Sequence, residues 1–538
     1  MSQPSWHRDA MDVCVLVGVG QSELYPAQRS SQAELKLGLN LLSGAIHHWP
    51  TRESPELFSM KSGVLALLLG LLTACQAPLA QIQSSGQGAA DRWDANAPVQ
   101  VAFNHNPDQR FTDSLGRDRE GDDLEGQLLA SLEQAQTSID VAVQEIQVPR
   151  LATALIQKHQ AGIPVRVIVE NQYRQPWSQR LSGNLSDRER QRLENYRQIA
   201  DRNGDGQLSP AEIAGGDAVL MLERAGVPIL DDTDDGSQGS GLMHHKFAII
   251  DRRWVVTGSA NWTASDFFGD PGRPASRGNA NHLLWFRSPA LAAIFQEEFN
   301  LMWGDGPSKL PDSRFGLGKP LRSPKSVRIG NTRLLVQFSP TSPRLPWQES
   351  TNGTIARYLT QAQKQIDLAL FVFSEQAIAD VLEARSQQGT QVRLLIDPGF
   401  AYRPYSELLD MVGLALPDRD CRVESNNRPW SSPLTTAGAP RLTPGDTLHH
   451  KFAVIDRQRV LTGSHNWSAA ANLRNDETFL VIEDSSLADR FRAEFERLYA
   501  DAFLGIPPAL QRRVNEAKRR CGSRITPNSN QDLTETED

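Results

Sequence analysis

The 538-residue chain has no excess of positive charge, no apolar run long enough to span a membrane, and only four cysteines. Its 56 Lys and Arg residues are outnumbered by 64 Asp and Glu residues, which gives a formal net charge of −8. Proteins that bind a nucleic acid along its length usually have more basic than acidic residues, so the composition argues against a processive nucleic-acid enzyme. The hydrophobic content of 39% is enough to bury two substantial cores.

Basic residues do gather in one stretch of the chain, and this stretch leaves two interpretations open. A cluster of arginines would bind phosphate groups, whereas the same run on a helix is usually a solvated face. The residues are Arg174, Arg180, Arg188, Arg190 and Arg192.

One motif, H-x-K-x-x-x-x-D trailed by G-S-x-N, occurs twice at a constant offset. The first copy comprises His244, Lys246, Asp251, Ser259 and Asn261, and the second comprises His449, Lys451, Asp456, Ser464 and Asn466. A single His-x-Lys on an apolar strand is more often a core or edge pair than a catalytic one. Two complete copies favour a paired catalytic site and indicate an internal duplication.

Each half alternates apolar runs with amphipathic stretches, a pattern typical of β-α-β units. In the first half the helical stretch Leu151–Ala161 separates an apolar run near Ile139 from the run Val165–Val169. Each motif begins where such a strand begins. Because strand side chains alternate, we expect each motif His and Lys to share one side, with His245 and His450 packing on the other.

The two motifs resemble those of the phospholipase D superfamily over about residues 100–505. The resemblance implies two similar α/β/α halves packed about a pseudo-twofold axis, with one active site built from both motifs of a monomer. We place the first half at 98–310 and the second at 331–505, joined by a linker at 311–330.

The residue types of the motif suit phosphodiester chemistry without a metal. A neutral imidazole attacks phosphorus to give a phosphohistidine, and a protonated imidazole gives a proton to the leaving oxygen. Two ammonium groups hold the non-bridging oxygens, and neutral donors add to them. This assigns catalysis to His244 and His449, and phosphate binding to Lys246, Ser259, Asn261, Lys451, Ser464 and Asn466. Asp251 and Asp456 belong to the same motifs, where we expect them to anchor a turn.

A downstream position differs between the halves, because Asn281 aligns with Glu477. In relatives this position often carries an acid that hydrogen-bonds a motif histidine, and a carboxylate raises a histidine pKa more than an amide does. If each residue serves its own half, His449 is biased toward the acid and His244 toward the nucleophile. The partner could instead come from Asp266 or Asp270, or from across the interface.

An insertion at about 178–218 lengthens the first half. It contains a loop with oxygen ligands at the EF-hand positions and a glycine, Gly206, at the sixth. The predicted calcium ligands are Asp201, Asn203, Asp205, Gln207 and Glu212. The capping box Ser186-Asp187-Arg188-Glu189 predicts the entering helix. We expect a structural calcium ion here; a solvated Asn/Asp/Gly turn is the alternative.

The N-terminal region predicts the compartment. Val64 to Leu72 is apolar, and Leu72-Thr73-Ala74-Cys75 fits a lipoprotein lipobox, so lipid attachment at Cys75 is expected after a signal peptide that starts at Met60. The alternative is a core helix at Val64–Leu72. Residues 1–75 are then a leader and 76–97 a tether, which places the protein on the periplasmic or outer face of a bacterial membrane, or outside the cell.

Two further expectations concern the C-terminal part. If Cys75 is lipidated, Cys421 and Cys521 are the cysteines left in the mature chain, and one disulfide between them is possible in an oxidising compartment. Residues 506–538 are predicted to be a disordered tail.

The resemblance and the lipid anchor favour a phospholipase D-type hydrolase that releases phosphatidic acid and a head-group alcohol, acting at a membrane surface. The alternative is an endonuclease acting on DNA or RNA, in which Trp262 and Trp467 would stack on bases or else pack beneath the site. Transphosphatidylation of the cardiolipin synthase type uses the same intermediate. A non-catalytic calcium-binding module would have decayed motifs, and these are intact.

Overall fold

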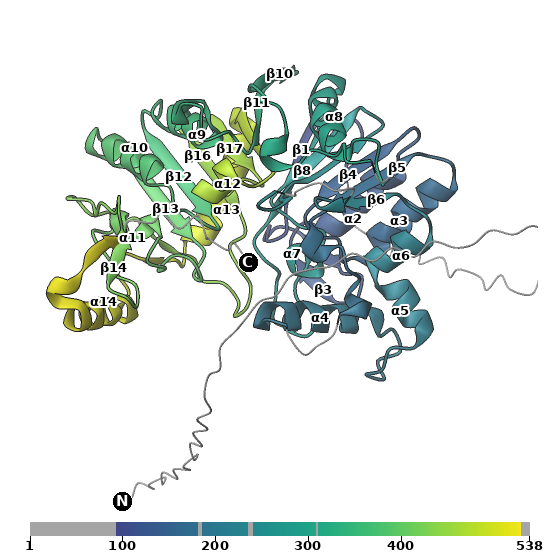
Figure 1. Cartoon of the computed structure of the whole chain (residues 1–538), viewed down its shortest axis with the longest axis horizontal. Helices are drawn as coiled ribbons and strands as arrows, with labels where there is room; N and C mark the ends of the chain where they lie inside the picture. The colour runs from purple at the N-terminus through teal and green to yellow at the C-terminus, as the bar shows by residue number, and fades with distance from the viewer. Residues whose placement is uncertain (1–92, 181–184, 235–239, 308–309, 529–538) are drawn as a thin grey trace, which may run out of the picture. The chain divides into compact units, whose positions relative to one another are not determined.

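The computed structural model describes residues 93–180, 185–234, 240–307 and 310–528 (Figure 1). The predicted leader, Cys75 and most of the predicted tether lie outside these residues. Among the helices that the structure describes, none is both long and apolar enough to cross a membrane.

A mixed sheet forms the centre of the first half, with seven strands in the order β1-β9-β8-β7-β4-β5-β6. The strands are β1 (Val99–Phe103), β4 (Ile139–Val143), β5 (Val165–Val169), β6 (Ile229–Asp231), β7 (Lys246–Ile250), β8 (Trp254–Gly258) and β9 (His282–Arg287). β4, β5 and β6 are parallel, as the predicted strand-helix-strand alternation requires, and the sheet continues antiparallel from β7 to β1.

The second half repeats this order in a nine-stranded sheet, β10-β11-β18-β17-β16-β12-β13-β15-β19. Its strands are β10 (Lys325–Ile329), β11 (Thr332–Ser339), β12 (Gln365–Leu370), β13 (Gln391–Ile396), β15 (Ala437–Ala439), β16 (Lys451–Ile455), β17 (Arg459–Gly463), β18 (Glu477–Glu483) and β19 (Phe503–Leu504). The seven strands from β11 to β15 match those from β1 to β6, so the internal duplication is structural. β10 lies inside the predicted linker 311–330, which therefore ends earlier than expected because this segment pairs with β11.

Helices cover the sheets on both faces (Figure 1). They are α2 (Leu124–Glu133), α3 (Pro149–Gln160), α6 (Ala218–Arg224) and α8 (Pro289–Trp303) in the first half, and α9 (Thr351–Leu359), α10 (Gln376–Gln387) and α13 (Ser485–Tyr499) in the second. α8 and α13 begin alike, with side-chain caps at Ser288 and Asp484. Their phenylalanines Phe295 and Phe491 are fully buried in one hydrophobic cluster that joins both halves.

Several short strands and α-helices lie outside the two main sheets. They are β2 (Arg110–Thr112), β3 (Asp118–Glu120), α7 (Ala264–Phe267), α11 (Glu407–Met411), α12 (Ala469–Leu473), β14 (Arg422–Glu424) and β20 (Thr526–Asn528).

The insertion of the first half folds as two helices, α4 (Asp187–Ala200) and α5 (Pro210–Gly216), on either side of the predicted calcium loop. Both begin with a complete capping box, in which Ser186 pairs with Glu189 and Ser209 with Glu212. A small apolar cluster that includes Leu193 and Tyr196 anchors α4 to the first half.

The expectation of a disordered tail from residue 506 is wrong for the segment that forms α14 (Pro508–Cys521). This helix is polar on most of its surface, which explains the prediction, but its apolar stripe of Leu510, Val514 and Ala517 packs against Leu409 and Leu416. A disulfide between Cys421 and Cys521 fastens its C-terminal end. The two cysteines that the sequence left as a possible pair are therefore bonded.

Candidate active site

The lysine of each motif is the first residue of a central strand, and the motif histidine lies two residues before it. Lys246 starts β7 opposite Val143, and Lys451 starts β16 opposite Leu370, so the two lysines occupy equivalent positions in their sheets. The strand alternation places each motif histidine on the side of its lysine and the intervening histidine on the other, as expected.

Backbone contacts between the halves bring the two motifs into one site. The N–H of His244 donates to the carbonyl of Asp476 at 3.0 Å, and the N–H of His449 donates to the carbonyl of Ala280 at 3.1 Å. Met243 and Leu448 make the corresponding parallel bridges to the other half. Each half contacts the other through the same segments, which is the reciprocity that a pseudo-twofold axis produces.

These contacts between the halves determine which side chain hydrogen-bonds to each motif histidine. Glu477 Oε2 lies 2.7 Å from Nδ1 of His244, and Asn281 Oδ1 lies 3.0 Å from Nδ1 of His449. The assumption that each residue serves its own half is wrong, because each bridge places the next residue of the opposite half beside the histidine. The carboxylate therefore lies beside His244 and the amide beside His449, so the pKa argument made from the opposite pairing does not support His449 as the acid. Asp266 also approaches His449, with 3.8 Å between Oδ2 and Nδ1.

The serines of the two G-S-x-N segments hold these partners. The hydroxyl of Ser464 donates to Glu477 Oε2 at 2.6 Å, and that of Ser259 donates to Asn281 Oδ1 at 2.7 Å. A hydroxyl has one proton to donate, so neither serine has one left for a phosphate oxygen. Both are fully buried. The predicted phosphate-binding role of the serines is therefore replaced by a positioning role.

His244 is held in one tautomer. Because the Glu477 carboxylate accepts a hydrogen bond from Nδ1–H, Nε2 is the nitrogen that carries the lone pair. Burial lowers the pKa of His244 well below its usual value, and the positive charges of Lys246 and Lys451 lower it further. A neutral imidazole with a free Nε2 is the form that a nucleophile needs.

The lysines are buried and oriented by backbone oxygens. Lys246 Nζ donates to the carbonyl of His244 at 2.9 Å and to Gln144 Oε1 at 3.2 Å. Lys451 Nζ donates to the carbonyl of His449 at 2.8 Å and lies 4.8 Å from the centre of the Phe371 ring. Each motif thus fixes its ammonium group beside its own histidine, where a phosphate would receive both charges.

Asp251 and Asp456 lie away from the histidines and anchor turns, as expected. Asp251 accepts backbone N–H groups from Gln136, Thr137 and Ser138, and Asp456 does the same with residues 363–365. Burial by itself would raise the Asp251 pKa, but these hydrogen bonds outweigh it and hold the pKa below its usual value. Each aspartate also has a positive φ, 55° and 52°, in the tight turn between two motif strands.

The intervening histidines contact glutamates of helices α8 and α13. His245 Nε2 lies 3.4 Å from Glu298 of α8, and His450 Nε2 lies 2.9 Å from Glu494 of α13. Both are fully buried, and burial lowers the pKa of each although the glutamate raises it. Their packing role is the one that the sequence predicts.

The asparagine of the first motif reaches the cleft. Asn261 lines a cavity of about 100 Å³ together with His449, Asp266 and Asp270. Its counterpart Asn466 is fully buried. Trp262 and Trp467, which follow the two asparagines, are also buried, at 2% and 1% exposure, so they pack beneath the site and have no open face on which a base could stack.

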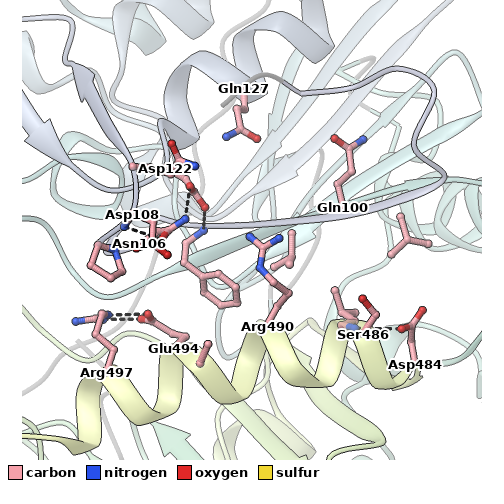
Figure 2. A pocket seen from close by; sticks show the side chains of 17 residues that line it. Gln100, Asn106, Asp108, Asp122, Gln127, Asp484, Ser486, Arg490, Glu494 and Arg497 are labelled. Atoms are coloured by element: carbon pink, nitrogen blue, oxygen red, sulfur yellow. Dashed lines mark hydrogen bonds and ion pairs between the residues drawn. The ribbon is translucent and has the colours of Figure 1, made fainter. Parts of the chain in front are cut away.

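A larger cavity of about 610 Å³ lies between β1 and α13 (Figure 2). Figure 2 shows Arg490 entering it from α13, while Glu494 and Arg497 pair on the same helix. Among the described residues that line it, none belongs to either motif. Size therefore does not identify the site of chemistry. The smaller cleft is lined by His449 and Asn261 of the motifs, whereas His244 and the two lysines are not among its described lining residues.

The predicted calcium loop has the oxygen-rich composition that a hard cation prefers. Asp201 accepts the backbone N–H groups of Gly204 and Gly206, and Gly206 adopts φ 78° at the loop position that requires a sharp turn. Glu212 faces the start of the loop, 3.1 Å from the N–H of Arg202. In the part of the chain that the structure describes, no group of three or more His, Cys, Asp or Glu side chains is arranged to hold a metal. Calcium binding stays a prediction that also depends on the oxygens of Asn203 and Gln207.

Comparison with known proteins identifies the family. Residues 128–303 and 355–499 match the family described as cardiolipin synthase, PLD-like domain. The chain belongs to this phospholipase D-like family. It is a phosphodiesterase hydrolase by enzyme class.

Three similar proteins illustrate the match. A mitochondrial cardiolipin hydrolase of Xenopus laevis is 28% identical over 34% of this chain and 79% of its own length. A phospholipase D of Rickettsia felis is 28% identical over 26% of this chain and 58% of its own length. A phosphatidylserine synthase of Haemophilus influenzae has a solved structure with 12% identity and a TM-score of 0.46, covering 79% of this chain and 93% of its own.

Proposed function

We propose that this phosphodiesterase hydrolyses a phospholipid to phosphatidic acid and a head-group alcohol through a phosphohistidine at His244. The observation that carries the proposal is the contact of 2.7 Å between Glu477 and Nδ1 of His244, which leaves Nε2 free. The names of the relatives, cardiolipin hydrolase and phospholipase D, support a lipid substrate.

In the first step Nε2 of His244 attacks phosphorus, and the bond from phosphorus to the head-group oxygen breaks. His449 gives a proton to that oxygen. In the second step His449 takes a proton from water, the water oxygen bonds to phosphorus, and the phosphorus–nitrogen bond breaks. Lys246 and Lys451 hold the non-bridging oxygens throughout, and Asn261 and Asn466 add neutral donors.

Two parts of the proposal concern the setting of the enzyme. Lipid attachment at Cys75 would place the site beside a membrane surface, on the periplasmic or outer face of a bacterial cell envelope. The loop at residues 201–212 would bind one calcium ion that clips the insertion and takes no part in the chemistry. The chain carries both motifs, so a monomer suffices for the site.

The test is phosphodiesterase activity of the full chain on vesicles of phosphatidylglycerol, phosphatidylethanolamine, phosphatidylcholine or cardiolipin, in parallel with single- and double-stranded DNA, with EDTA and with calcium. We expect vesicle cleavage that persists in EDTA and is lost when His244 or His449 is replaced by Ala. DNA cleavage with inert vesicles would make the protein a nuclease and overturn the proposal. If an added alcohol is converted to a new phosphatidyl ester and no phosphatidic acid forms, the enzyme is a transferase.

A further inference from the structure

The cleft at His449 is walled on one side by the insertion. Its lining includes three residues of α4, namely Gln191, Arg192 and Asn195. The second half of the chain contributes Gly445, Thr447 and His449. A helix that has no counterpart in the duplicated half therefore forms part of the catalytic cleft.

Hydrogen bonds fix this wall of α4 in place. Asn195, which is 1% exposed, donates through Nδ2 to Asp270 Oδ1 at 2.7 Å and to Ser265 Oγ at 3.1 Å. Gln191 donates to Asn195 Oδ1 at 3.1 Å. These bonds tie α4 to the segment that follows the first motif, so the cleft is preorganised.

Arg192 is also part of this lining and is held by contacts with the first half. Its Nε lies 3.4 Å from Glu145 Oε2, and its guanidinium lies 4.8 Å from the centre of the Tyr173 ring. Gln147 donates to the backbone carbonyl of Arg192 at 3.3 Å. Glu145 and Gln147 come from the segment directly after β4, which also supplies Gln144 to Lys246.

The position of the cleft assigns it to one part of the substrate, and this step rests on the proposed function. His449 is the residue that gives a proton to the leaving oxygen, and it lines the cleft. In an in-line displacement the nucleophile and the leaving group stand on opposite sides of phosphorus. The cleft therefore receives the alcohol that leaves.

The size and chemistry of the cleft define that alcohol. Its volume of about 100 Å³ is well below the roughly 300–1,000 Å³ of pockets that enclose drug-sized ligands. Its described lining contains no Phe, Tyr or Trp on which a base could stack. Three carboxylates, of Glu145, Asp266 and Asp270, face two guanidinium groups, of Arg192 and Arg273, among several amides and hydroxyls.

We propose that α4 is the specificity wall of a leaving-group pocket that selects a small head-group alcohol bearing hydrogen-bond donors and no negative charge. Glycerol and ethanolamine meet this description. Choline has no donor on its trimethylammonium group, and serine brings a carboxylate into a cleft that already holds three.

The experiment compares head groups with the full chain. Vesicles of one inert ether lipid carry phosphatidylglycerol, phosphatidylethanolamine, phosphatidylcholine or phosphatidylserine, and kcat/KM is measured for each. We expect the first two to be cleaved at least about tenfold faster than the last two, because a site built for hydrogen bonds discriminates against groups that leave them unmade.

Two variants of the wall then test α4 itself. Arg192→Ala and Gln191→Ala should reduce the tenfold preference to within about threefold. Arg197→Ala is the matched control, since Arg197 is exposed on the same helix and does not line the cleft. It should keep the preference. Because Gln191 is only partly buried, its variant carries the test if loss of Arg192 prevents folding.

The outcomes separate the two proposals. Cleavage of all four lipids at similar rates by the parent protein, or an unchanged preference in both wall variants, overturns the specificity wall and leaves the phospholipase activity standing. Failure of the parent protein to cleave any vesicle overturns the proposed function, and the inference falls with it.

Discussion

His244 and His449 occupy equivalent positions before β7 and β16, yet Glu477 contacts the first and Asn281 the second. The backbone bridges are alike in the two cases, so the difference lies in one side chain. A carboxylate behind an imidazole accepts a hydrogen bond from its N–H and stabilises the positive charge that forms on attack, whereas an amide does this less. The proposed division of labour between the two histidines therefore depends on one difference between otherwise similar halves.

The surroundings of the two lysines differ in the same manner. Gln144 accepts a hydrogen bond from Lys246, whereas the aligned residue of the second half, Phe371, presents its ring to Lys451. Each half also carries a segment that the other half lacks. The first carries the insertion with α4 and α5, and the second carries α14 with its disulfide.

The largest effect should come from removal of a motif histidine. His244→Ala and His449→Ala should each lower kcat on a phospholipid by about 10³-fold or more. The two should diverge on a phosphodiester with a p-nitrophenol leaving group, which departs without a proton. On this substrate His449→Ala should still form the phosphohistidine intermediate, whereas His244→Ala should not. Burst kinetics measure this, and equal burst amplitudes in the two variants would remove the division of labour.

Loss of the disulfide should be the largest effect on stability. The Cys421–Cys521 bond closes a loop with a sequence separation of 100 residues, so Cys421→Ser should lower the free energy of unfolding by about 3 kcal/mol or more. Urea denaturation of the oxidised parent and the variant gives the difference. The parent with its disulfide reduced is the control, and it should match the variant. An unchanged midpoint would mean that α14 is held by packing alone.

Substitution of the side chains that contact the two histidines should change kcat and its pH dependence. Glu477→Gln should lower kcat by about 10²-fold, because His244 loses the carboxylate that stabilises its positive form. Asn281→Asp puts a carboxylate beside His449 and raises the pKa of that acid. Since His449 must be protonated to act, the alkaline limb of the kcat profile should move to higher pH. The kcat–pH profile of Glu477→Gln is the comparison. An identical shift of its alkaline limb would contradict the assignment of His449 as the acid.

The equivalent turn aspartates should show equal and smaller effects. Asp251→Asn or Asp456→Asn should lower the free energy of unfolding by about 1–3 kcal/mol and leave the head-group preference unchanged. The pKa of each is depressed in the folded protein, so this stabilisation is present above the unfolded pKa of about 3.9 and is lost as the pH falls through the folded pKa. Denaturation at pH 7 and near pH 3 measures it. A large loss of kcat with normal stability would assign these residues to the chemistry.

The calcium loop should have the smallest effect on turnover. Asp201→Asn combined with Glu212→Gln should abolish one calcium site in isothermal titration while kcat in EDTA stays unchanged. Asp187→Asn, on the same insertion and outside the loop, is the control and should retain the site. Identical titrations of the double variant and the parent would show that the loop is a solvated turn.

The sequence was sufficient for the framework and for the identity of the reacting groups. Two spaced copies of the motif predict the duplicated α/β halves, and strand alternation predicts the opposite orientations of His244 and His245. The exchanged partners were not predictable from alignment within each half. Glu477 reaches His244 through the bridge between Met243 and Asp476, which is a long-range contact.

Two further features depended on tertiary contacts. Ser259 and Ser464 are donors in any context, and only the fold shows that their single proton goes to Asn281 and Glu477. The helix α14 is too polar for its narrow apolar stripe to stand out in the sequence. The helical spacing of Leu510, Val514 and Ala517 was the pattern from which this helix could have been predicted.

The division of labour between the histidines is tested most directly by locating the covalent adduct. In His449→Ala, the second step lacks the residue that takes the proton from water, so an intermediate formed from a p-nitrophenyl phosphodiester should accumulate. Rapid alkaline quench and peptide mass spectrometry should find the phosphoryl group on the peptide that contains His244. No adduct should form on either peptide in His244→Ala. An adduct on His449 in His244→Ala, with none on His244 in His449→Ala, would contradict the account.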